Sequence, residues 1–175
     1  MSLPPWREEP IGKKHAREAF DCGEEALNEF LRRYARKSHQ AGGSKTFLAV
    51  DDADGKTILG FYTLSPVSVE YARAPDVVKR GLGRHDVPGF RLARLAVDRP
   101  LQGKGLGGQL LLAAGRRCLR AASEVGGVML VIDAKNENVA AWYARYGAVA
   151  LEASPLTLVL PLATISAALN AAGKG

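Results

Sequence analysis

The residues best suited to chemistry form a glycine-rich segment between an apolar run and a helical pattern. Four glycines fall within six residues, in Gly103-Lys104-Gly105-Leu106-Gly107-Gly108. Glycine lets the backbone approach a ligand closely, and the first turn of a helix presents N–H groups without an intrahelical partner. A strand, a glycine loop and a helix start favour anion binding, most often phosphate. The sequence therefore predicts a phosphate cradle at 102–108.

The elements on either side of this cradle are predicted from periodicity. Gly89–Asp98 reads as a central strand, which Pro100 stops because proline cannot donate to a ladder. A helix is predicted from Leu106 to about Ser123, and an apolar strand buried on both faces over Val128–Ile132.

The rest of the chain predicts an α/β fold with a mixed central sheet of six to seven strands and flanking helices, in one domain spanning 1–175. The first helix runs from Cys22 to about Gln40, and its apolar face carries Leu27, Phe30, Leu31 and Tyr34. The remaining expected elements are an edge strand at 7–14, a hairpin of 46–50 and 57–64, a long connection at 65–88 with a short helix at 76–80, a helix at 139–146, strands at 148–153 and 156–160, and a terminal helix at 163–172.

Composition narrows the class of protein. The chain has 175 residues, 47% of them apolar, with no apolar run of the roughly 20 residues that cross a bilayer. No basic segment followed by an apolar one opens the chain, so we expect a cytoplasmic protein without a secretion signal. Cys22 and Cys118 lack metal-ligand spacing, and we expect no metal. The net charge of +6 suits a polyanionic partner, although a merely solvated basic surface is the alternative.

The glycine loop also matches a dinucleotide fingerprint through Gly103, Gly105 and Gly108. That match is weak, because a dinucleotide turn follows its strand at once and requires a βαβ opening that this chain lacks. No Walker sequence is present, which argues against a P-loop nucleotidase.

The segment Gln102-Gly103-Lys104-Gly105-Leu106-Gly107 fits the Gln/Arg-x-x-Gly-x-Gly signature, and the chain resembles the GNAT superfamily of N-acetyltransferases. Within it the chain is most similar to the acetyltransferase toxins of type II toxin–antitoxin pairs. Five further segments carry that likeness: Phe20–Gly23 with Leu27 and Phe30-Leu31, Gly60–Ser65, Leu92–Asp98, Ala134–Asn136 and Trp142–Gly147. Ala148 departs from the phenylalanine that the family often has there.

The resemblance implies a donor, acetyl-coenzyme A, and places for its parts. Amides of Gln102, Gly103, Lys104, Gly105, Leu106, Gly107 and Gly108 would hold the pyrophosphate. The strand segment Leu95, Ala96 and Val97 would receive the acetyl and pantetheine groups between two splayed parallel strands, and Asn136 would bind pantetheine or order the site. The resemblance also implies an aminoacyl-tRNA acceptor, a ribbon-helix-helix antitoxin and a homodimer.

The resemblance implies that Tyr143 contacts the cofactor and is the catalytic acid, because in the resembled family the tyrosine of this helix protonates or hydrogen-bonds the departing coenzyme A sulfur. The alternative is that Trp142, Tyr143 and Tyr146 are core or dimer aromatics. Asn136 has its own alternative, since it or Asn138 suits a helix N-cap.

No general base is visible in mid-strand, which favours an acceptor that is already partly neutral. An α-amine has a pKa of about 7.7–8.0 and a lysine side chain one of about 10.4. The cations predicted to contact tRNA are Arg32, Arg33, Arg36 and Lys37 on the first helix and Arg91 and Arg94 on the central strand. The alternatives are a small-molecule amine or a protein N-terminus as acceptor, or a non-catalytic coenzyme A-binding or repressor partner of an antitoxin.

Overall fold

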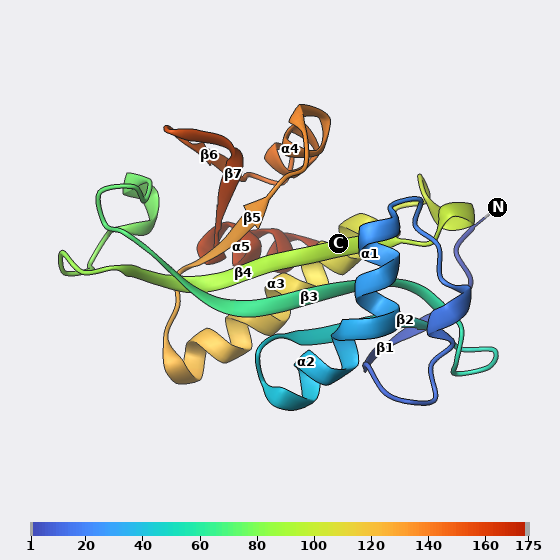
Figure 1. Cartoon of the computed structure of the whole chain (residues 1–175). Coiled ribbons are helices and arrows are strands. Elements are labelled where there is room, and N and C mark those ends of the chain that lie inside the picture. The colour runs from blue at the N-terminus through green and yellow to red at the C-terminus, as the bar shows by residue number, and fades with distance from the viewer. Residues whose placement is uncertain (1, 174–175) are drawn as a thin grey trace. The chain divides into compact units, whose positions relative to one another are not determined.

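The computed structural model describes residues 2–173 and contains one mixed seven-stranded sheet in the order β1-β2-β3-β4-β5-β7-β6 (Figure 1). The strands are β1 (Trp6–Pro10), β2 (Lys45–Asp51), β3 (Ile58–Val69), β4 (Val87–Val97), β5 (Met129–Asp133), β6 (Val149–Leu151) and β7 (Ser154–Pro161). The α-helices are α1 (Glu25–Glu29), α2 (Ala35–Ala41), α3 (Leu106–Val125), α4 (Glu137–Ala144) and α5 (Leu162–Gly173). The predicted fold class is confirmed.

The backbone divides into two compact units, and several elements pass from one into the other. Unit 1 comprises Met1–Ser65 and Ala93–Leu111, and unit 2 comprises Pro66–Leu92 and Leu112–Gly175. In unit 2, β4 pairs in parallel with β5 through Phe90–Leu92, while β5 and β6 both pair antiparallel with β7. None of the helices within residues 2–173 is long and apolar enough to cross a membrane.

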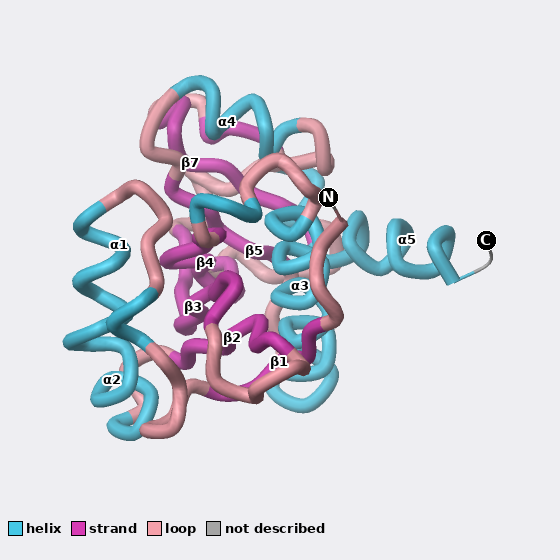
Figure 2. The backbone as a smooth tube through the Cα atoms, turned by 90° about the vertical axis from the view of Figure 1, so that its right-hand side faces the viewer, coloured by secondary structure: helices cyan, strands magenta, loops and turns pink. Residues whose placement is uncertain are grey.

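In unit 1, α1 and α2 lie beside β2 and β3, as Figure 2 shows. Their shared core contains Phe30, Leu31, Leu48 and Phe61, all buried. Phe61 stacks on Phe30 with ring centroids 6.4 Å apart, and meets Phe20 edge-on at 5.5 Å. This packing fixes the helical segment that carries most of the predicted tRNA-binding cations.

The predicted first helix is interrupted by a π-helix at Phe30–Tyr34, in which the Ala35 N–H donates to the Phe30 carbonyl. A π turn adds a residue to the ladder and rotates everything after it. Ala35 is therefore fully buried, whereas 55% of Tyr34 is exposed. The prediction that Tyr34 belongs to the apolar face was wrong for this reason.

Other boundaries differ from the predicted ones by a few residues. β3 continues through Pro66 to Val69, which shortens the predicted connection, and only Asp76–Val78 of the predicted short helix forms, as a 3₁₀ turn. Helix α4 begins at Glu137, two residues before the predicted start, because Asn136 caps it. Residues Met129–Ile132 are all buried, as predicted for β5.

Substituting Gly89 with alanine is expected to destabilise unit 2. A Cβ at Gly89 would lie 2.5 Å from the Met129 carbonyl oxygen and 2.7 Å from its Cγ. Overpacking of this kind costs about 1–3 kcal/mol, which urea unfolding measures. Gly12→Ala is the matched control, since its Cβ would meet only His15 atoms at 3.8 Å. Equal midpoints for the two variants would contradict the expectation.

Acid is expected to weaken an ion cluster around Glu9 in unit 1. The Glu9 carboxylate accepts from Arg7 Nε at 2.6 Å, His15 Nε2 at 2.9 Å and Lys14 Nζ at 3.0 Å. Hydrogen bonds from Arg7, His15 and Lys14, in that order, lower the pKa of Glu9 to about 2. A lowered carboxyl pKa contributes stability above the unfolded pKa of about 4.5, and this stability disappears as pH falls towards 2. Glu9→Gln should therefore lose less stability than wild type between pH 5 and pH 2.5 in urea unfolding, and an identical loss would refute this.

Candidate functional site

The glycine loop has the geometry of an open backbone cradle. β4 ends at Val97, a 3₁₀ turn follows at Arg99–Leu101, and α3 begins at Leu106. Gly103 has φ +81° and Gly105 φ +90°, and a Cβ on either would meet no heavy atom within 4 Å. The first bond of α3 runs from the Gln109 N–H to the Gly105 carbonyl at 3.2 Å, so the preceding amides form the open helix start. Unpaired amides at a helix start of this kind are able to bind an anion.

The side chains of Gln102 and Leu106 make structural contacts, whereas a Cβ at Gly103 or Gly105 would point into open space. Leu106 is 1% exposed and packs in the core. The Gln102 side chain donates to the Cys22 carbonyl at 2.8 Å and to the Val97 carbonyl at 2.9 Å. The Gln102 N–H donates to the Arg99 carbonyl at 3.2 Å, so the amides open to a ligand begin at Gly103.

The predicted acyl-binding segment is the end of β4. Ala96 is 5% exposed and belongs to the core beneath α1, whereas Leu95 and Val97 are half-buried. Alternation along a strand places Leu95 and Val97 together on the face opposite Ala96. The Ala96 face of this segment therefore belongs to the core, whereas the face of Leu95 and Val97 is only half-buried.

Asn136 and Tyr143 lie in unit 2. The Asn136 side chain accepts the Val139 N–H at 2.9 Å, so it is the N-cap of α4, which was one of its two expected roles. Tyr143 is 6% exposed, and its ring meets Trp142 edge-on at 4.9 Å. Burial raises the pKa of Tyr143 to about 12, which keeps its hydroxyl protonated at neutral pH.

One of the predicted cations of the first helix forms an ion pair, and others are exposed to solvent. Arg32 pairs with Glu25 at 2.5 Å, while Arg33 and Lys37 are exposed. The buried Nε of Arg36 has no hydrogen-bond partner among residues 2–173.

Both strand arginines already have partners within the protein. Arg94 lies over the Phe30 ring, 3.6 Å from its centroid, and burial lowers its pKa. Arg91 forms an ion pair with Asp133, which also accepts a hydrogen bond from Thr157. Part of the charge of Arg91 is therefore already compensated within unit 2.

The structure groups the predicted residues in two sets, each within its own unit. Unit 1 holds the glycine loop, Leu95–Val97, Arg94 and the first-helix cations, and unit 2 holds Arg91, Asn136 and Tyr143. Two residues of unit 1 were missed. Arg17 donates to the Arg32 carbonyl at 3.2 Å and has a buried, unpartnered Nε within the described chain. Asn28 is 4% exposed, and a polar residue on the buried stripe Asn28–Leu31–Ala35 was the available signal.

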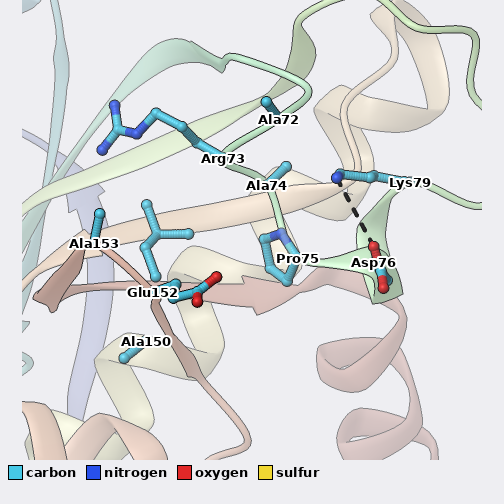
Figure 3. Close-up of a pocket in the computed structure, with 10 residues that line it drawn as sticks. Ala72, Arg73, Ala74, Pro75, Asp76, Lys79, Ala150, Glu152 and Ala153 are labelled. Carbon is cyan, nitrogen blue, oxygen red and sulfur yellow. Dashed lines mark ion pairs between the residues drawn. The ribbon is translucent and has the colours of Figure 1, made fainter.

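A cavity of about 590 Å³ in unit 2 contains none of the predicted site residues. It is lined by residues 72–76, Lys79 and residues 150–153. Figure 3 shows Lys79 and Asp76 facing each other at one end, where they pair at 3.8 Å. Lys79 also lies over the Tyr71 ring at 4.4 Å, so this cation is already engaged.

Two curated proteins are similar to this chain over most of its length. The tRNA-acetylating toxin of Mycobacterium tuberculosis is 37% identical over 142 residues, covering 81% of this chain and 83% of that toxin. A protein of Sinorhizobium fredii named "Probable toxin TacT" is 30% identical over 166 residues, covering 90% and 91%.

Two solved structures share the fold. AtaT complexed with acetyl-methionyl-tRNAfMet has a TM-score of 0.86 and 28% identity, covering 94% of this chain and 99% of that one. A tyrosine-to-phenylalanine mutant of AtaT bound to acetyl-CoA and the C-terminus of its antitoxin AtaR has a TM-score of 0.80 and 28% identity, covering 94% and 98%. Residues 42–147 match the acetyltransferase (GNAT) domain. With the open glycine loop between β4 and α3, these matches show that the chain belongs to the GNAT family of acetyltransferases.

Proposed function

We propose that this acetyltransferase transfers the acetyl group of acetyl-CoA to the α-amine of an aminoacyl-tRNA and so blocks translation, acting as a toxin. The observation that carries the proposal is the 37% identity to a tRNA-acetylating toxin, over 81% of this chain. The open cradle at Gly103–Gly108 and the exposed cations Arg33 and Lys37 supply sites of the right charge for both substrates. We also propose that the whole chain works as a single domain.

Backbone amides bind acetyl-CoA, and the protonated phenol of Tyr143 interacts with its leaving group, the coenzyme A sulfur. Amides from Gly103 to Gly108 hold the diphosphate at the positive end of α3. Main-chain groups of Leu95 and Val97 orient the acetyl arm, and the thioester, when bound, supplies an activated carbonyl. Tyr143, whose hydroxyl is protonated at neutral pH, hydrogen-bonds the departing sulfur and passes its proton to it, and the proton that the attacking amine loses restores the phenol.

Acetyl transfer is direct, without an acyl-enzyme. Cys22 and Cys118 are both buried, and burial raises the pKa of each thiol, that of Cys118 to about 12. A thiol in this state is a poor nucleophile, because the thiolate is the reactive form. The acceptor amine therefore attacks the bound acetyl group itself.

We propose that the phosphates of the acceptor tRNA bind to cations of the protein. The group proposed to contact tRNA phosphates consists of Arg32, Arg33, Arg36, Lys37, Arg91 and Arg94. Arg33 and Lys37 contribute most because they are exposed, and Arg32 contributes less because Glu25 compensates it. An α-amine needs little help in losing its proton, which suits a site without a general base.

AtaT binds the C-terminus of its antitoxin AtaR, and we propose a cognate ribbon-helix-helix antitoxin for this chain. We further propose that the protein forms a homodimer and acts in the cytoplasm.

Coenzyme A thiol release by the purified protein tests the acceptor class. Acetyl-CoA is supplied with charged tRNA, with polyamines or with a peptide carrying a free N-terminus. The proposal expects turnover with charged tRNA that weakens steeply as salt rises, because phosphate contacts release counterions. Turnover with only the polyamine or only the peptide would show that this compound, and not tRNA, represents the acceptor class. No turnover with any of them would favour a coenzyme A-binding module.

A further inference from the structure

Asn28 fixes the start of helix α1 to the segment before it. Its side chain is buried, donates from Nδ2 to the Asp21 carboxylate at 2.9 Å and accepts the Cys22 N–H at 2.9 Å. Leaving a buried polar group without a partner is destabilising, so a buried amide whose donor and acceptor are both engaged strongly specifies its surroundings. The position of α1 is therefore tied to Asp21 and Cys22.

Gln102 extends this connection into the glycine loop. Its Nε2 donates to the carbonyls of Cys22 and Val97, at 2.8 and 2.9 Å. The backbone N–H of Cys22 is therefore bound by Asn28, and the backbone carbonyl of Cys22 is bound by Gln102. Because Gln102 directly precedes Gly103, one short path of hydrogen bonds joins the cradle to α1.

Asp21 binds the residues that directly follow β4. Its N–H donates to the Asp98 carboxylate at 3.0 Å, and its carbonyl accepts the Arg99 N–H at 2.9 Å. Its carboxylate accepts from Gly23 N–H and from Asn28, and lies 3.5 Å from the Arg99 guanidinium. The Gly23 bond, then Asn28, lowers the pKa of Asp21, so the accepting carboxylate is the form present at neutral pH.

We propose that Asn28 and Gln102 are positioning residues that couple occupancy of the glycine loop to the position of α1 and of the cations that follow it. This inference rests on the proposed function for the donor that fills the loop, and goes beyond it. An anion in the cradle restrains Gly103 and Gly105. The restraint passes through the Gln102 side chain to Cys22 and through Asn28 to α1. Donor binding thereby orders the surface that receives the acceptor.

Hydrogen exchange of the full chain, with and without coenzyme A, tests the coupling. In wild type, coenzyme A is expected to slow exchange at 103–110 and also at 24–34. Gln102→Met keeps the side-chain length but removes the donor and with it both Nε2 hydrogen bonds. Protection should then be confined to 103–110, while the Kd for coenzyme A rises about tenfold. Gln109→Met is the matched control, because Gln109 accepts from Trp6 Nε1 at 3.2 Å instead.

Asn28→Asp provides a second variant that leaves Gln102 and the loop in place. It places a carboxylate against Asp21 and removes the Nδ2 donor, so loop protection should persist while protection at 24–34 is lost. Protection of 24–34 that persists in both variants, or that is missing in wild type despite bound coenzyme A, would overturn the coupling alone. Failure of wild type to bind coenzyme A would overturn the donor assignment, and the coupling with it.

Discussion

Replacing Tyr143 with phenylalanine is expected to lower kcat by about 10²–10⁴-fold, the contribution of a positioned general acid, and to leave the Kd for coenzyme A unchanged. Only the hydroxyl is removed, and the buried ring keeps its contact with Trp142. Because the pKa of Tyr143 is raised to about 12, the wild-type rate should show no alkaline decline from this group below about pH 10. Single-turnover acetyl transfer, with coenzyme A binding measured separately, separates chemistry from affinity.

Tyr146→Phe is the matched control, since Tyr146 is a neighbouring tyrosine of the same cluster, 5.1 Å from Trp142. It should keep most of the wild-type rate. A Tyr143→Phe protein that transfers acetyl at the wild-type rate would make Tyr143 a packing residue, which was the alternative from the sequence.

Reversing the charge of Arg33 and Lys37 together is expected to raise the KM for charged tRNA by about 10- to 100-fold and leave the KM for acetyl-CoA unchanged. A hydrogen bond to a charged group contributes about 1.5–3 kcal/mol, and 1.4 kcal/mol corresponds to a tenfold change. The salt dependence of the KM for tRNA should also become shallower, because fewer phosphate contacts remain. Initial rates at several salt concentrations measure both effects.

The control reverses Arg116 and Arg120, two exposed cations of α3, which gives the same change in net charge. If both double variants weaken tRNA binding equally, the effect belongs to net charge and the first-helix assignment fails. Arg32→Gln should have a smaller effect than Arg33→Gln, because Glu25 already compensates Arg32.

The fold was largely predictable because its strands and helices follow simple periods. The burial of Met129–Ile132 and the helix from Leu106 follow from apolar spacing alone. The π-helix was not predictable in this way, since it depends on how Phe30, Leu31 and Ala35 share one core. Its rotation exposes Tyr34, which a regular helix would bury.

The candidate site was predictable in its backbone parts and less so in its side chains. Glycine spacing predicted the loop, and the structure gives Gly103 and Gly105 the positive φ that such a loop needs. The side-chain roles of Asn28 and Gln102 depend on contacts between residues up to 80 positions apart, which no local pattern reports. Arg91 and Arg32 looked equivalent to Arg33 in sequence, but they are less exposed and are paired with Asp133 and Glu25.

Mass spectrometry of aminoacyl-tRNA from cells expressing this chain tests the central claim most directly. Translation should stop, and the tRNA fraction should contain an amino acid acetylated on its α-amine that is still esterified to tRNA. Cells expressing the Tyr143→Phe variant should grow and lack it. Arrested cells whose aminoacyl-tRNA carries no acetyl group would contradict the proposed acceptor.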